Sequence, residues 1–172
     1  MASTFENFSN IATSFPSVIT AEPRTFRQVY EQNRQRIYSL SFWMTDNELI
    51  AEQLLERTFR RAFRAVRKPS AGALDRALLC ELRELMPLGK LSLRSPVCAE
   101  VANVRRNTLR VHLERAVVQL PPTEKMVFLM HDVEGYGRAR IAGYLGMSCE
   151  QVQQGLHQAR LRLRQLLAAS SS

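Results

Sequence analysis

A run of polar side chains near the C-terminus contains the residue types that hydrogen-bond to DNA bases. Glutamines dominate the run, and a glutamine side chain can read the edge of adenine in the major groove. Arginines stand before and after it, and their forked guanidinium groups suit phosphate. The sequence therefore predicts DNA contacts at Arg138, Arg140, Ser148, Glu150, Gln151, Gln153, Gln154, His157 and Arg160.

Other chemistry has little support in the sequence. The three cysteines are far apart and form no CxxC pair, so neither a disulfide framework nor a zinc site is indicated. The three histidines have no cysteine or carboxylate at ligand spacing. His131 and Asp132 are adjacent, but adjacent helical residues point about 100° apart, and no matching nucleophile is present. We predict no catalytic residue, no metal site and no cofactor.

The elements that must position the polar run read as a helix, a glycine turn and a second helix. Gly146 falls where two short helices need a close approach, and Ser148 is a suitable N-cap with Gln151 three residues later. Such a helix-turn-helix places its second helix in the major groove. An ordinary helical hairpin in a bundle is the alternative interpretation. The expected core residues are Ile141, Ala142, Leu145, Val152 and Leu156.

Helical periodicity extends over most of the remaining chain, and no segment reads convincingly as a strand. The expected helices cover residues 23–44, 48–67, 73–86, 97–118 and 123–134, with "TDNE" at Thr45–Glu48 as a capping box. The Pro, Gly and Ser content of "PLGKLSLRSP" indicates a linker. We therefore predict an all-α chain with two small helical domains: a tail at 1–22, a domain at 23–86, a linker at 87–97 and a helix-turn-helix domain at 98–172.

Charge also separates the two halves of the chain. The net charge is +8, and most of the excess of basic residues lies after residue 86. A basic C-terminal half is the better candidate for a polyanion surface. Arginine far outnumbers lysine, which either phosphate recognition or a GC-rich genome would explain. No apolar run is long enough for a membrane span, no signal peptide is apparent, and the cysteine pattern fits a reducing cytoplasm.

Two segments resemble the extracytoplasmic-function group of bacterial sigma factors, in the sigma-70 family. "LERAVVQLPPTEKMVFLMHDVEGYGRARIAGYLGMSCEQVQQGLHQARLRLRQLL" resembles the family's fourth region, and "RIYSLSFWMTDNELIAEQLLERTFRRAFRAV" resembles its second region. The resemblance implies an alternative sigma factor that gives RNA polymerase promoter specificity and catalyses no reaction itself. Its implied partners are the polymerase core and promoter DNA. It also allows an anti-sigma partner, although no residue indicates one.

The resemblance divides the work between segments. Residues 138–164 would read the −35 promoter element, residues 73–86 would melt and read the −10 element, and residues 46–63 would bind the polymerase. The implied −10 contacts are Arg76 and Arg83. The implied polymerase contacts are Glu52, Gln53, Glu56, Arg57 and Arg60, whereas Leu54 and Phe59 in the same stretch are expected to be core residues.

The departures from the family pattern leave other interpretations open. The −10 segment lacks the usual Trp and Asn, and three acidic residues, Asp75, Glu81 and Glu84, would oppose a DNA strand. In the expected reading helix, Gln153, Gly155 and Gln158 stand where basic residues are common, so phosphate binding should be weaker. One alternative is therefore a sigma-derived regulator or adaptor that does not melt promoters. Another is a helical interaction protein that binds no nucleic acid.

Overall fold

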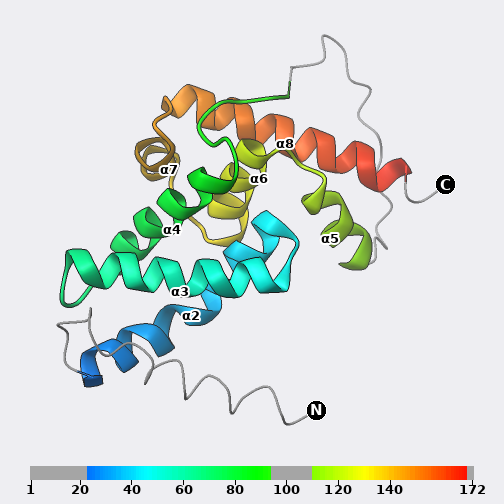
Figure 1. Cartoon of the computed structure of the whole chain (residues 1–172). Coiled ribbons are helices and arrows are strands. Elements are labelled where there is room, and N and C mark those ends of the chain that lie inside the picture. Colours follow the sequence, from blue (N-terminus) through cyan, green and yellow to red (C-terminus); the bar gives the residue numbers. More distant parts are fainter. Residues whose placement is uncertain (1–22, 94–109, 170–172) are drawn as a thin grey trace. The chain divides into compact units, whose positions relative to one another are not determined.

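The computed structural model of the chain describes residues 23–93 and 110–169, and all regular elements in these residues are helical (Figure 1). The predicted all-α class is therefore confirmed. Two compact units emerge. Of the described residues, 23–41 and 47–81 fall in the first unit, and 42–46, 82–93 and 110–169 in the second. The predicted tail, the end of the linker and the helix expected from residue 97 lie outside the described residues up to residue 109.

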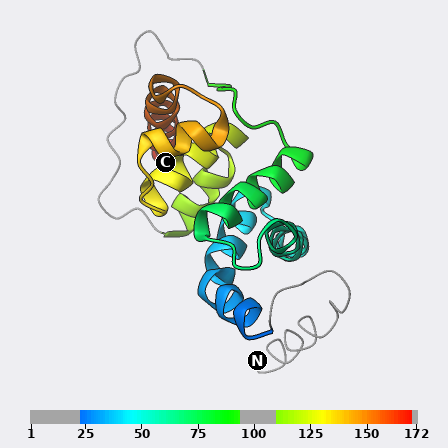
Figure 2. The same cartoon turned by 90° about the vertical axis from the view of Figure 1, so that its left-hand side faces the viewer.

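The first unit is built around α3 (Glu48–Ala65), against which α2 (Pro23–Thr45) and α4 (Ala71–Leu85) lie (Figures 1 and 2). The buried side chains of α3 recur at helical spacing and face the core, whereas Leu49 near its start and Val66 just after its end are exposed. Both Leu54 and Phe59 are buried, which confirms them as core residues. Aromatic contacts join α2 to α3, with the Phe26 and Phe63 ring centroids 5.0 Å apart.

Two buried carboxylates on α4 also hold the first unit together. Asp75 accepts a hydrogen bond from Arg36 at 2.5 Å, and Glu81 pairs with Arg61 at 2.5 Å and with Arg57 at 2.7 Å. Both carboxylates are nearly inaccessible to solvent, with exposures of 1% for Asp75 and 3% for Glu81. The expectation that they oppose a DNA strand is therefore wrong, because their charge is directed inward to arginines of α2 and α3. Glu84 is exposed, as expected.

The second unit packs short helices against one long helix, α8 (Cys149–Ala169). In Figure 1, α7 lies at the N-terminal end of α8, and α5 lies near its C-terminal half. The buried side chains of this unit include Met126, Leu129 and Ile141. The short helices are α5 (Arg110–Val118), α6 (Pro122–Phe128) and α7 (Arg138–Leu145), with the π-helical turn η1 (Leu129–Val133) after α6.

Helix boundaries differ from the sequence prediction in three places. The N-cap of α3 is Asn47, whose side chain accepts the Ile50 N–H, whereas Thr45 is the last residue of α2. The helix predicted after Pro122 becomes π-helical, since Glu134 N–H bonds to the Leu129 carbonyl, five residues back. α3 and α4 also begin or end one to two residues from their expected limits. Among the described residues, no helix is both long and apolar enough to cross a membrane.

Candidate nucleic-acid interface

The helix-turn-helix forms from local signals that the sequence carries. Gly146 ends α7 with φ 69° and ψ 37°, a left-handed conformation that glycine adopts without the steric cost of a Cβ. Ser148 then caps α8: its Oγ accepts the Gln151 N–H at 3.1 Å, and the Gln151 side chain accepts the Ser148 N–H at 2.9 Å. This reciprocal capping box satisfies two amide groups at the helix start.

The expected scaffold of the helix-turn-helix is confirmed. Every predicted core residue is buried: Ile141, Ala142 and Leu145 on α7, and Val152 and Leu156 on α8. Because these residues fix one face of α8, its opposite edge is left in solvent. We call that edge the reading edge, and it consists of Ser148, Glu150, Gln151, Gln153, Gln154 and His157, all exposed.

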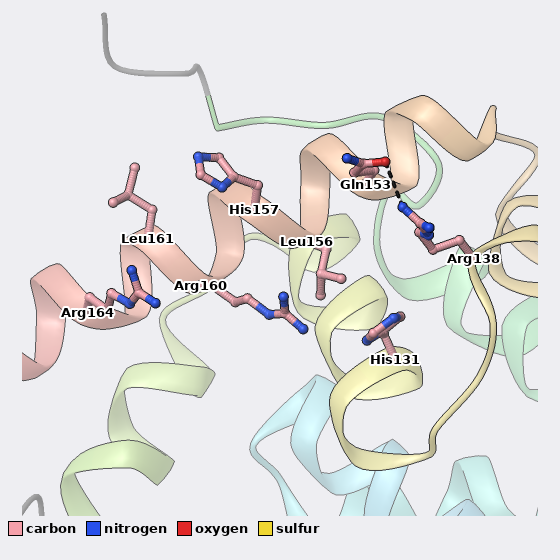
Figure 3. Close-up of a pocket in the computed structure, with 8 residues that line it drawn as sticks. All are labelled: His131, Arg138, Gln153, Leu156, His157, Arg160, Leu161 and Arg164. Atoms are coloured by element: carbon pink, nitrogen blue, oxygen red, sulfur yellow. Dashed lines mark hydrogen bonds between the residues drawn. The ribbon is translucent and has the colours of Figure 1, made fainter. Parts of the chain in front are cut away.

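Beside the reading edge lies a surface hollow of about 430 Å³ with basic walls (Figure 3). Figure 3 shows Arg138 from α7 on one side and His157, Arg160 and Arg164 from α8 along the other. Three arginines around one opening concentrate positive charge where a phosphate group could enter. We call this surface the basic hollow; it is lined by His131, Arg138, Gln153, Leu156, His157, Arg160, Leu161 and Arg164.

Two of the arginines in the basic hollow already have partners within the chain. Arg138 donates to the Gln153 Oε1 at 2.7 Å, which links α7 to the reading edge. Arg160 makes a forked contact with Asp132, at 3.0 and 2.6 Å. The hydrogen bond from Arg160, more than any other cause, holds the pKa of Asp132 below its usual value, and it raises the pKa of Arg160.

The contact between His131 and Asp132 corrects a sequence argument. These adjacent residues were expected to point apart, yet the His131 Nδ1 lies 2.8 Å from the Asp132 Oδ1. They lie in the π-helical turn η1, where the backbone departs from α-helical geometry. Together with Arg160, His131 and Asp132 form an ion cluster. Among the described residues, no group of three or more His, Cys, Asp and Glu side chains could hold a metal ion.

The predicted DNA contacts do not all lie together. The basic hollow includes Arg138, Gln153, His157 and Arg160, but Arg140 is directed to aromatic rings instead. The Arg140 guanidinium lies 4.0 Å from the Tyr136 ring centroid, and its Nε donates to the Tyr144 hydroxyl at 3.1 Å. His131 and Arg164 were not among the individually predicted contacts. The signal for Arg164 was its spacing on α8, four residues after Arg160, whereas His131 comes from η1 and had no such signal.

Two of the three positions that depart from the basic family pattern do not face the reading edge. Gly155 and Gln158 are buried, and only Gln153 is exposed. The expected loss of phosphate contacts therefore applies at most to Gln153. Arg162 is outside the basic hollow and bonds to Gln165 at 3.5 Å, whereas Arg160 and Arg164, two residues to either side of it, line the hollow.

The residues implied for polymerase and −10 contacts lie on α3 and α4. Glu52 and Gln53 are exposed on α3, while Glu56 is paired with Arg60. Arg57 is about half exposed and also reaches the buried Glu81. On α4, Arg76 is exposed, and Arg83 donates to the Tyr144 carbonyl at 2.8 Å within the second unit.

Comparison with known proteins supports the resemblance seen in the sequence. Residues 110–163, from the start of α5 to well along α8, match the family described as Sigma-70, region 4. This stretch of the chain is therefore similar to sigma-70 region 4. It is also 27% identical over 160 residues to the ECF RNA polymerase sigma factor SigE of Mycolicibacterium smegmatis, a match that covers 84% of this chain.

The two matches agree with the resemblance to extracytoplasmic-function sigma factors that the sequence motifs indicate. The region 4 match covers the helix-turn-helix and most of α8, so it includes the whole reading edge. It also includes the residues of the basic hollow, except Arg164, which comes directly after the last matched residue. The similarity to the mycolicibacterial sigma factor extends beyond region 4, although the chain spans only 62% of that protein's length.

Proposed function

We propose that the chain is an alternative sigma factor, which binds core RNA polymerase in the cytoplasm and gives it promoter specificity. The observation that carries this proposal is the capped, exposed reading edge of α8 beside the basic hollow, within a region 4 domain. In this function the reading edge contacts bases of the −35 element, and the basic hollow contacts the phosphates of one strand. The chain acts by binding and catalyses no reaction of its own.

The exposed α3 side chains support a polymerase contact in the first unit. The solvent-facing side of α3 carries Glu52, Gln53 and the Glu56–Arg60 pair, whereas the opposite side of the helix is buried in the core. Arg57 is partly exposed, and its ion pair with Glu81 holds its side chain in one orientation. Less conformational entropy of Arg57 would therefore be lost when a partner binds. An anti-sigma partner remains an expectation from the resemblance alone.

A second candidate function has specific support in α4. Residues 71–85 include no aromatic residue, and their exposed positions are Ala71, Arg76, Cys80, Arg83, Glu84 and Leu85. Capture of flipped bases usually depends on aromatic stacking. This surface favours an adaptor that binds polymerase and the −35 element but contributes little to melting.

The phosphate role of the basic hollow can be tested with one pair of variants. Arg164→Gln should weaken binding to duplex DNA and reduce the slope of log affinity against log salt by about 1, because one phosphate contact is lost. Arg162→Gln removes the same charge from the same helix but outside the basic hollow, so it should change the slope little. Fluorescence anisotropy over a salt series measures both. Equal effects of the two variants would contradict a role for the basic hollow.

The function itself is tested by adding the chain to core polymerase with a promoter library. Productive initiation at a defined set of promoters supports the sigma factor. Polymerase binding without initiation, on any member of the library, supports the adaptor. Absence of both polymerase and DNA binding would favour the helical interaction protein.

A further inference from the structure

Two imidazoles lie among the arginines of the basic hollow. His131 comes from η1, and His157 comes from α8, one turn before Arg160. In the proposed function the arginines of the hollow bind phosphate, and His131 has no role. Imidazole changes its charge between about pH 5 and pH 8, whereas a guanidinium stays charged. Two histidines at this surface would therefore make its positive charge depend on pH.

His131 shares a carboxylate with Arg160. The Asp132 Oδ1 lies 2.8 Å from the His131 Nδ1 and 2.6 Å from the Arg160 Nη2, and the Asp132 Oδ2 accepts the Arg160 Nε–H at 3.0 Å. In Figure 3 the Arg160 guanidinium points toward the His131 ring. When His131 is neutral, the charges of Arg160 and Asp132 cancel. When His131 is protonated, the three side chains together carry one positive charge.

The contact with Asp132 also decides which nitrogen of neutral His131 carries the proton. An ionised carboxylate only accepts hydrogen bonds, so the proton is assigned to Nδ1, and Nε2 is left as an acceptor. The hydrogen bond from Arg160 is the main cause that lowers the pKa of Asp132, so this carboxylate stays ionised where imidazole titrates. The His131 side chain is 31% exposed, and its Nε2 has no hydrogen-bond partner among the described residues. Neutral Nε2 would repel a phosphate oxygen, whereas protonated Nε2 would donate a hydrogen bond to it.

No carboxylate other than Asp132 lines the basic hollow. Its remaining charged side chains are Arg138 of α7 and Arg164 of α8, and Glu134, directly after η1, is not among the lining residues. The two charged residues of α6 are buried and do not line the hollow either: Glu124 and Lys125. Three arginines and one carboxylate give two net positive charges, and protonation of both imidazoles would double that charge.

We propose that His131 and His157 are proton-dependent phosphate ligands of the basic hollow, so that the chain binds DNA more tightly as the pH falls from about 8 to about 6. This inference rests on the proposed sigma function, in which the hollow contacts DNA phosphates. Protonation adds a hydrogen-bond donor at each histidine. The charge of His131 also partly balances that of Asp132, so Arg160 is held less tightly and can bind a phosphate instead. Because phosphate contacts carry no sequence information, the effect should appear on any duplex.

Anisotropy titrations of the full chain with a labelled mixed-sequence duplex, at about pH 8 and about pH 6 over a salt series, test this directly. At the lower pH the unaltered chain should bind several-fold more tightly, and the slope of log affinity against log salt should steepen by about 2, one for each imidazolium. His131→Gln and His157→Gln should each remove about half of this change, and the double variant should remove all of it. His112→Gln is the matched control and should keep the whole change, because His112 lies on α5 outside the hollow.

Proton uptake gives a second measurement that is independent of the affinity. If protonated histidines bind phosphate better, then by linkage the binding of DNA must increase the number of protons that the chain carries near neutral pH. Calorimetric titrations in two buffers of different ionisation enthalpy should therefore detect proton uptake with the unaltered chain and with His112→Gln, but not with the double variant.

The possible results separate this inference from the proposed function. Duplex binding that is equal at both pH values, or a pH response that persists in the double variant, would overturn the role of the histidines and leave DNA binding by the chain intact. A full response in His131→Gln would exclude His131 as a phosphate ligand. Absence of duplex binding at both pH values would contradict the proposed function itself, and the role of the histidines would fail with it.

Discussion

Asp132 holds the Arg160 guanidinium in the basic hollow through two hydrogen bonds. Its two carboxylate oxygens occupy the Arg160 guanidinium in the geometry that a phosphate would otherwise take. Arg138 is held more weakly, by the neutral Gln153 amide. The phosphate affinity of this surface therefore depends on an acidic neighbour as well as on the number of arginines.

Replacing Asp132 tests this competition. Asp132→Asn should raise affinity for duplex DNA several-fold and steepen the salt dependence by about one phosphate contact, because Arg160 is released. The matched control is Glu114→Gln, which removes the same charge and frees Arg110 on α5, outside the basic hollow. Anisotropy titrations in a salt series compare the two. A lower affinity in Asp132→Asn would instead mean that the carboxylate orients Arg160 for DNA.

The same pair predicts an acid-dependent loss of stability. The pKa of Asp132 is lowered in the folded chain, so the pair stabilises the fold above the unfolded pKa of about 4, and this contribution is lost as the pH falls through the lower folded pKa. Thermal unfolding of the unaltered chain and Asp132→Asn should differ at neutral pH and converge once the pH falls below the lowered folded pKa of Asp132. The pair is largely exposed, so we expect a small difference. A difference that is constant across this range would contradict the assignment.

At the scale of elements, features that depend on residues close together in the sequence were predicted correctly, whereas contacts between residues far apart in the sequence were not. The Ser148 cap, the Gly146 turn and the α7–α8 core depend on residues within a few positions of one another, and all were predicted. Asp75 was misjudged because its partner Arg36 is distant in the chain. The bonds from Ser92 and Leu93 to Glu124 were missed for the same reason: a Pro- and Gly-containing segment looks like a free linker until the fold brings Glu124 to it.

The N-cap of α8 is the element-scale feature most open to measurement. Ser148→Ala removes one half of the capping box and should destabilise the second unit by about 1 kcal/mol. Gln154→Ala, an exposed position further along the same helix, serves as the control and should have little effect on stability. Thermal unfolding followed by circular dichroism distinguishes them. Equal stability of the two variants would show that the cap contributes nothing.

Across the whole molecule, the two units differ in how completely their sites are formed. The region 4 unit presents an exposed, capped reading edge and a basic hollow. In α4, by contrast, two of the three acidic side chains are turned inward, which removes the expected repulsion of DNA without supplying aromatic rings. In the proposed function, the chain is therefore better equipped to recognise a duplex promoter than to open one.

This difference between the two units predicts that transcription depends strongly on whether the −10 element is already melted. With core polymerase, transcription from a template premelted across the −10 element should exceed that from the matched duplex by at least about tenfold, because premelting removes the unstacking cost of several kcal/mol that α4 is poorly built to meet. Moving the premelted bubble upstream of the −35 element is the control and should give no stimulation. Equal output from the duplex and the premelted template would show that α4 opens DNA without aromatic side chains, and would exclude the adaptor in favour of a complete sigma factor.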